Sequence, residues 1–248
     1  MRLYNADCFD VLESLEDKSV DAVITDPPYA TTGKGWDAPF DLDKWWGHIN
    51  RVLKDDGVAI VFADEPFSSQ LVVSNIQHFR YEWIWDKSQI SGAMLASKRP
   101  LKHTEDIYVF SKNTPRYYLD FLLDDCDRVR KSPFTNRIQG GSEFGEIDND
   151  NLDGSHRTTK TGYPKEVVKF AGVRVPAGES KLHIAQKPDA LMEWLIQLYT
   201  KPSQVVLDPF MGSGSTGVAC KKLGRDFIGV ELYPDYYQIA GDRLDIQR

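Results

Sequence analysis

Four consecutive residues near the N-terminus combine groups that could hold an amino group. Asp26, Pro27, Pro28 and Tyr29 follow the largely apolar run 20–24. Proline fixes φ and removes a backbone donor, so the two prolines hold a rigid turn that presents carbonyl acceptors beside a carboxylate and an aromatic ring. The turn predicts a site for an amino group; a strand that simply ends at prolines is the structural alternative.

A second candidate site is a glycine-rich loop near the C-terminus. The loop consists of Asp208, Pro209, Phe210 and Met211, followed by Gly212, Gly214 and Gly217. Its Gly-x-Gly-x-x-Gly spacing lets the backbone approach a ligand, and the helix expected after it offers free N–H groups. Glu231 follows at the distance where an acidic side chain reaches ribose hydroxyls in nucleotide-binding folds. A Walker loop is excluded because no Lys-Ser/Thr pair follows the glycines.

Strand and helix patterns alternate through most of the chain, which predicts an α/β fold. We expect strands at 2–5, 20–24, 58–63, 80–85, 106–110, 205–207 and 227–232. We expect helices at 9–15, 41–53, 68–77, 187–199, 215–223 and 234–244, with residues 86–99 as a loop.

The position of the glycine loop decides how the sheet must be built. A nicotinamide enzyme builds several strands after its first glycine loop. Here only residues 218–248 follow Gly217, too few to finish a sheet. The N-terminal strands must complete it, so we predict a doubly wound, mostly parallel, Rossmann-like sheet. Because open α/β sheets bind ligands at the carboxyl ends of their strands, the Asp26 turn and the glycine loop should face one crevice.

Composition and charge narrow the class of protein. The chain has 248 residues and a net charge of −7, with basic stretches at 87–138 and 156–187 flanking an acidic one at 139–155. Such stretches could place phosphate contacts on one face; scattered solvated lysines are the alternative. The longest apolar runs are too short to span a bilayer, so we expect a cytoplasmic protein without membrane contact. The three cysteines, Cys8, Cys126 and Cys220, have no metal-site or disulfide spacing, and we expect no metal.

Taken in this order, the motifs resemble the β class of DNA amino-methyltransferases, which use S-adenosylmethionine. The resemblance rests on Asp26 to Tyr29, on Asp208 to Gly217, and on Gln186, Lys187 and Pro188 before an expected helix. It extends through 81–87 and 103–112.

The resemblance implies a methyltransferase domain in permuted order. Residues 1–112 would form its catalytic half and 181–248 its cofactor-binding half. Residues 113–180 are dense in polar residues, glycine and proline, and would be a target-recognition insert.

By position, the resemblance also implies roles around the cofactor. Asp208 and the glycine loop would hold its methionine end, Lys187 its carboxylate, Glu231 its ribose and Asp7 its adenine. The cofactor-binding residues expected are Asp7, Lys187, Asp208, Phe210, Gly212, Gly214, Gly217 and Glu231.

The chemistry of amino methylation fits the Asp26 turn. An exocyclic amino nitrogen is a poor nucleophile because its lone pair is delocalised into the ring. Asp26 and the Pro27 carbonyl can each accept one N–H, and this arrangement aims the lone pair at the methyl group. The two hydrogen bonds become stronger as positive charge develops on the nitrogen. Tyr29 would stack on the target base. Adenine N6 is favoured over cytosine N4, because resembling enzymes that act on cytosine more often carry Ser in place of Asp26.

The expected substrate is double-stranded DNA with the target base flipped out of the duplex. Candidate pocket walls are Trp36 and Phe40, for which core packing is the alternative. Candidate DNA contacts are Lys98, Arg99, Lys102, Arg128, Arg130, Lys131 and Arg137.

Alternatives to adenine methylation stay open from the sequence. They are cytosine N4 methylation, an inactive methyltransferase-like DNA-binding module and, disfavoured by the missing strands, a nicotinamide enzyme. The sequence leaves open the recognition site, a homodimer and a cognate restriction endonuclease.

Overall fold

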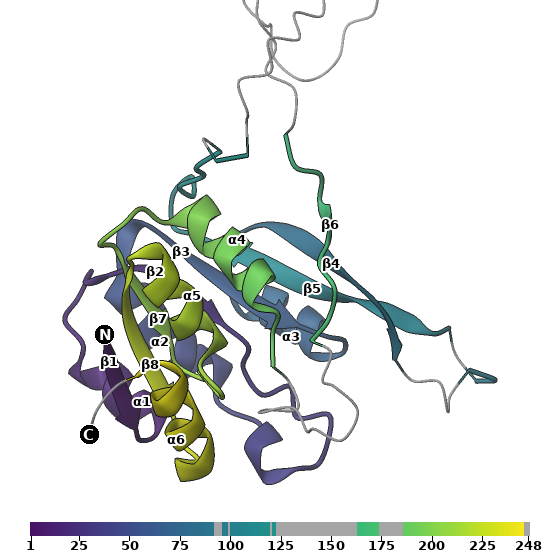
Figure 1. Ribbon diagram of the computed structural model, residues 1–248, viewed down its shortest axis with the longest axis horizontal. Helices are drawn as coiled ribbons and strands as arrows, with labels where there is room; N and C mark the ends of the chain where they lie inside the picture. Colours follow the sequence, from purple (N-terminus) through teal and green to yellow (C-terminus); the bar gives the residue numbers. More distant parts are fainter. Residues whose placement is uncertain (92–95, 99, 120, 123–162, 174–185, 246–248) are drawn as a thin grey trace, which may run out of the picture. The chain divides into compact units, whose positions relative to one another are not determined.

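The chain folds into two compact units, of which the larger contains the sheet. The computed structural model describes residues 1–91, 96–98, 100–119, 121–122, 163–173 and 186–245 (Figure 1). Residues 1–118 and 165–248 form the first unit, and residues 119–164 form the second. The eight strands and the six α-helices of the described residues lie in the first unit.

Eight strands form one sheet in the order β1-β8-β7-β2-β3-β5-β4-β6. Their bounds are β1 Arg2–Asn5, β2 Val20–Thr25, β3 Leu53–Ala63, β4 Phe79–Ser91, β5 Lys102–Phe110, β6 Val167–Lys169, β7 Val205–Asp208 and β8 Asp226–Glu231. Strands β1, β8, β7, β2 and β3 pair in parallel, β5 is antiparallel to both β3 and β4, and β6 is parallel to β4. The predicted doubly wound, mostly parallel sheet is confirmed.

Helices cover both faces of the sheet. Their bounds are α1 Cys8–Ser14, α2 Leu42–Val52, α3 Phe67–Ser74, α4 Asp189–Tyr199, α5 Ser215–Leu223 and α6 Pro234–Arg243, with a short 3-10 helix, η1, at Gly35–Asp37. In Figure 1, α4 and α5 lie across the near face of the sheet. Helices α1, α2 and α3 pack into a core with Val23, Ala59 and Val61 of the central strands.

The central strands are buried on both faces. All six residues of β2 are buried, as expected for a parallel strand between two helical layers. Its one charged residue, Asp21, accepts hydrogen bonds from Lys54, Arg116 and Gln204 and from the backbone N–H of Val205. The buried negative charge of Asp21 is therefore compensated by these donors, at the edge of the sheet opposite the two sequence motifs.

Four strands differ from the sequence prediction. β3 begins at Leu53 instead of residue 58, and β5 begins at Lys102 instead of residue 106. The loop expected at 86–99 is wrong in its first part, because β4 continues to Ser91 and pairs Asp86 with Thr104 and Ser91 with Lys102. The short segment Val167–Lys169 forms β6, although it lies inside the range expected for the insert. It pairs with Ile84 to Asp86 of β4. These segments owe their conformation to pairing with a neighbouring strand rather than to a local pattern.

Within the described residues, no helix combines the length and apolar character needed to cross a membrane.

Packing beneath the glycine loop generates a first prediction. A Cβ added at Gly229 of β8 would meet the sulfur of Met211 and, at 2.6 Å, the ring of Phe227. Gly229→Ala should therefore lower the free energy of unfolding by about 1 to 3 kcal/mol through overpacking, measured by denaturant titration.

The matched control is Gly47→Ala on the exposed side of α2, where a Cβ would have nothing within 4 Å. Alanine should there raise the free energy of unfolding by up to about 1 kcal/mol, because it is the better helix former. Gly229→Ala with wild-type stability would contradict the packing argument.

Candidate active site

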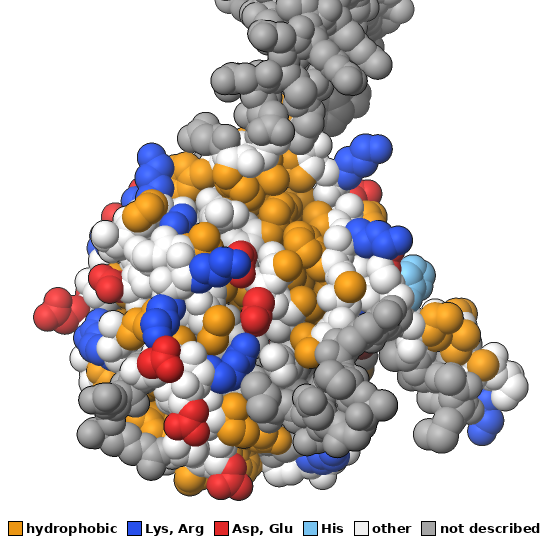
Figure 2. Space-filling view, viewed as in Figure 1, with side chains coloured by type: hydrophobic (Ala, Val, Ile, Leu, Met, Phe, Trp, Pro, Cys, Tyr) orange, Lys and Arg blue, Asp and Glu red, His pale blue; other side chains and the backbone are white. Residues whose placement is uncertain are grey.

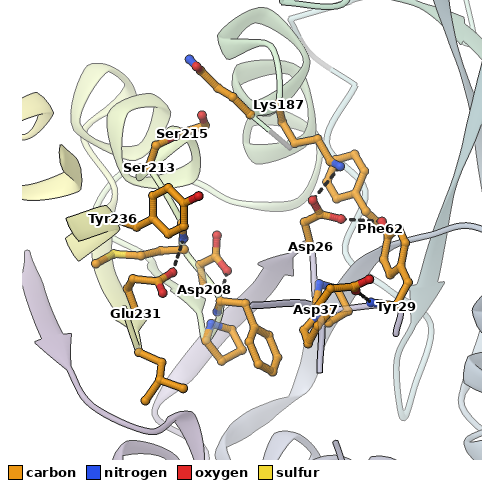
Figure 3. Close-up of a pocket in the computed structure, with 18 of the residues that line it drawn as sticks. Asp26, Tyr29, Asp37, Phe62, Lys187, Asp208, Ser213, Ser215, Glu231 and Tyr236 are labelled. Atoms are coloured by element: carbon orange, nitrogen blue, oxygen red, sulfur yellow. Dashed lines mark hydrogen bonds and ion pairs between the residues drawn. The ribbon is translucent and has the colours of Figure 1, made fainter. Parts of the chain in front are cut away.

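One cavity of about 660 Å³ collects both sequence motifs. The Asp26 turn enters it from the end of β2, and the glycine loop enters from the end of β7 (Figure 3). Glu231, at the end of β8, and Glu105, on β5, also line it. The two turns therefore meet at the carboxyl edge of the sheet, as expected for neighbouring parallel strands. The volume lies in the usual range for a cofactor or small-molecule pocket.

The Asp26 carboxylate is held by donors from two elements. Its Oδ2 accepts a hydrogen bond from Lys187 Nζ at 2.7 Å, and its Oδ1 accepts one from the Tyr29 hydroxyl. The Asp26 side chain is 20% exposed. Burial raises the pKa of Asp26, and the Lys187 ammonium is the largest opposing influence. The charge of Asp26 thus depends on its ion pair.

Lys187 bridges two carboxylates. Besides Asp26, its Nζ lies 2.6 Å from Oε1 of Glu105, and it sits 4.8 Å from the centre of the Phe62 ring. Burial alone would lower the pKa of Lys187, but the two carboxylates outweigh it and hold the pKa above its usual range. The role predicted for Lys187, at the carboxylate end of the cofactor, stays a prediction.

Asp37 fixes the loop that follows the turn. Its Oδ1 accepts the backbone N–H groups of Tyr29 and Ala30, and its Oδ2 accepts those of Thr31 and Thr32, all at 2.6 to 2.8 Å. Burial raises the pKa of Asp37, but the hydrogen bonds outweigh burial and leave the pKa below its ordinary value. The carboxylate therefore acts as a clamp on the loop 29–32.

Asp208 braces the glycine loop against the sheet. Its two oxygens accept hydrogen bonds from the hydroxyls of Thr25 at 2.7 Å and Thr216 at 2.6 Å. The backbone N–H of Phe210 donates to it as well, at 3.1 Å. Burial raises the pKa of Asp208 to about 6. Asp208 thus connects β2, β7 and α5; its predicted contact with the cofactor stays a prediction.

Glu231 and the glycine loop form the other end of the cavity. The Glu231 oxygens accept the N–H groups of Gly212 at 2.9 Å and Tyr233 at 2.8 Å. Gly214 has φ +79° and precedes α5, a conformation that side chains other than glycine rarely adopt. Asp7, on the same cavity, caps α1 by accepting the N–H of Phe9.

These groups fit the S-adenosylmethionine that the resemblance implies. A carboxylate aligned by two backbone N–H groups, Glu231, can accept from a ribose diol. Leu232 and Phe210 add apolar walls, and the start of α5 offers N–H groups to an anionic end. The donor set therefore matches a nucleoside with a charged tail.

Aromatic side chains wall the cavity beside Asp26. The Tyr29 ring stacks on Phe67 with centroids 5.3 Å apart, and Phe40 lies 5.2 Å from Phe210. Phe40 thus lies at the predicted wall while also packing in the core. Trp36 lies in η1, and its side chain is outside the described residues.

Two of the seven predicted DNA contacts lie in described residues. Lys98 is exposed, and Lys102 pairs with Asp64. Figure 2 shows Lys and Arg side chains interspersed with Asp and Glu on one face. The others, Arg99, Arg128, Arg130, Lys131 and Arg137, lie outside the described residues.

Three polar residues of the site are not among those predicted from the sequence. They are Asp37, Glu105 and Thr25, whose contacts come from other segments. Glu105 stands directly before the strand expected at 106–110, and this place at a strand end was the available signal for it; Asp37 has no feature that separates it from other loop aspartates.

Comparison with known proteins assigns the arrangement to a family. The DNA methylase family matches residues 20–242. Type II methyltransferase M1.MboII of Moraxella bovis is 30% identical over 257 residues, covering 96% of this chain and 94% of that protein. Type II methyltransferase M.HindIII of Haemophilus influenzae is 50% identical over 302 residues, covering 99% and 96%.

Solved structures agree with the fold. The crystal structure of the M1.HpyAVI-SAM complex has a TM-score of 0.65 at 26% identity and covers 99% of both chains. PvuII DNA methyltransferase, titled cytosine-N4-specific, has a TM-score of 0.67 at 18% identity, covering 97% of this chain and 85% of that one. At that identity the second likeness shows the fold alone.

The Asp37 clamp generates a second prediction. In Asp37→Asn the amide nitrogen would face two N–H donors, which leaves them unpaired. The free energy of unfolding at neutral pH should fall by about 1 to 3 kcal/mol, and the amides of 29–32 should exchange faster with deuterium. The exposed variant Asp226→Asn should change neither quantity; equal protection in both variants would contradict the clamp.

The wild-type clamp should also depend on pH. Because the folded-state pKa of Asp37 lies below its unfolded value of about 3.9, its stabilisation is present above that pH and is lost as pH falls through the folded pKa.

Proposed function

Because the chain belongs to the family of S-adenosylmethionine-dependent DNA amino-methyltransferases, we propose that it methylates the N6 atom of adenine at a specific sequence in double-stranded DNA. The observation that carries the proposal is the Asp26 carboxylate at the wall of the cavity that also contains the glycine loop and Glu231. The relatives named Type II methyltransferases support a specific DNA site.

The cofactor end of the cavity would be formed by Glu231 and the glycine loop. When bound, S-adenosylmethionine supplies an electrophilic methyl group on a positively charged sulfur. Glu231 binds ribose hydroxyls, and the start of α5 receives the methionine end. Asp208 keeps the loop in place through Thr25 and Thr216.

Asp26 would act on the amino group of the base. Its carboxylate and the Pro27 carbonyl each accept one N–H, so the nitrogen becomes more tetrahedral and its lone pair points away from the ring. These hydrogen bonds strengthen as the nitrogen gains positive charge, which stabilises the transition state more than the bound base. Asp37 holds the loop behind the turn, so the two acceptors keep their geometry.

The flipped base would lie against aromatic side chains. Tyr29 and Phe40 line the cavity beside Asp26 and offer flat apolar surfaces. In this proposal residues 113–180 recognise the target, between a catalytic half at 1–112 and a cofactor-binding half at 181–248. Lys98, Arg99 and Lys102 would contact DNA phosphates.

The choice of base generates a third prediction. Purified protein, S-adenosylmethionine and genomic DNA should yield N6-methyladenine after digestion to nucleosides and mass spectrometry. Mapping the methylated positions should return one short sequence motif. Product consisting of N4-methylcytosine alone would refute the adenine assignment and keep the methyltransferase one.

Loss of the catalytic carboxylate generates a fourth prediction. Asp26→Ala should lower single-turnover methyl transfer by at least about 100-fold, since a pre-aligned hydrogen-bonding group at the reacting atom is removed. Cofactor affinity measured by calorimetry should stay within about three-fold, a free-energy change under 1 kcal/mol. The control Asp226→Asn, at the exposed start of β8, should transfer methyl groups at the wild-type rate. Unchanged transfer in Asp26→Ala would remove Asp26 from the mechanism.

A further inference from the structure

Two carboxylates and an aromatic ring lie next to the Lys187 ammonium. It lies 2.7 Å from Asp26 Oδ2 and 2.6 Å from Glu105 Oε1, and the Phe62 ring is 4.8 Å away. The side chain is only 10% exposed, and Figure 3 shows it reaching toward Asp26. An ammonium has three donors, and two carboxylates lie within ion-pair distance of this one.

Charges of opposite sign alternate outward from Asp26. The order is Asp26, Lys187, Glu105 and then Lys87, whose Nζ lies 3.4 Å from Glu105 Oε2. Glu105 comes from β5, and its side chain is 11% exposed. A lone buried charge is costly, so each member depends on its neighbours for compensation.

Both oxygens of Asp26 already accept hydrogen bonds. Lys187 occupies Oδ2, and the Tyr29 hydroxyl occupies Oδ1. An amino group entering the cavity must share or take one of these places. If Lys187 withdraws from Oδ2, Glu105 is the carboxylate already in contact with it.

We propose that Lys187 and Glu105 are positioning residues for Asp26. Lys187 keeps Asp26 a carboxylate in the closed cavity, and Glu105 retains the ammonium when the amino group takes Oδ2. The inference rests on the proposed function in that the incoming group is the amino group of a base.

The proposal predicts opposite effects for its two members. The titratable groups that face Asp26 are Lys187, Tyr29, Glu105 and the neighbouring Asp208. Removing the Lys187 charge leaves Asp26 with burial and negative neighbours, which raises the pKa of Asp26. Removing the Glu105 charge takes away a negative neighbour, which lowers it.

The test is a titration of the Asp26 carboxyl carbon by ¹³C NMR in the full chain without cofactor. Asp26→Asn identifies the signal. In Lys187→Gln the midpoint should rise by at least about one pH unit, and in Glu105→Gln it should fall. Glu82→Gln on β4 and Lys222→Gln on α5 are matched controls away from the site and should leave it unchanged.

Cofactor binding separates this role from a cofactor contact. Calorimetry should give S-adenosylmethionine affinities within about three-fold of wild type for both variants. A loss of about 100-fold in Lys187→Gln with an unmoved Asp26 midpoint would make Lys187 a cofactor ligand and overturn the proposal. Midpoints that move in the same direction in the two variants would overturn it as well.

The link to the reaction is read from the pH dependence of single-turnover methyl transfer. The acidic limb should move to higher pH in Lys187→Gln and to lower pH in Glu105→Gln. A wild-type protein that fails to methylate DNA would refute the proposed function, while the carboxyl titration would still decide the positioning role. If Lys187→Gln does not fold, the Asp26 midpoint is measured in Lys187→Met, which removes the same charge, and in Glu105→Gln.

Discussion

The ion pair between Asp26 and Lys187 joins residues 161 positions apart, and the cavity depends on it. Asp26 directly follows β2, whereas Lys187 precedes α4, so the pair ties the edge of the sheet to the helix layer on one face. Removing two charges from water is costly and is offset only by close geometry. Displacing α4 would leave Asp26 without its cation and Glu105 with Lys87 alone, so the ion pairs at the cavity wall also hold α4 to the sheet.

The neighbouring strands β2 and β7 each end beside a carboxylate, Asp26 and Asp208. The two carboxylates differ in their hydrogen-bond partners. Asp208 accepts hydrogen bonds from two threonine hydroxyls and a backbone N–H, so its oxygens hold β2, the glycine loop and α5 together. Asp26 has an ammonium and a phenol as partners, both at the cavity wall. The two threonine hydroxyls hold Asp208 to β2 and α5. In the proposed reaction Asp26 instead exchanges its lysine partner for an incoming donor, and Glu105 is already in contact with that lysine.

Most elements of the fold were predictable because strands buried on both faces appear as short apolar runs between helical patterns. The errors lie where pairing with another strand decides the conformation: the early starts of β3 and β5, the continuation of β4 to Ser91 and the short β6. The missed site residues follow the same rule. Asp37 and Glu105 matter through contacts with segments that a local pattern does not contain.

The sequence by itself determined that an acceptor turn and a glycine loop lie at the carboxyl edge of one sheet. Motif identity and strand order suffice for that inference, since parallel strands bring their ends together. Only the tertiary structure decided that Lys187 faces Asp26 and Glu105 and that Asp37 holds the loop behind the turn. The reason is physical: the charge that compensates a buried carboxylate depends on distances across the sheet, which residue types and spacing do not specify.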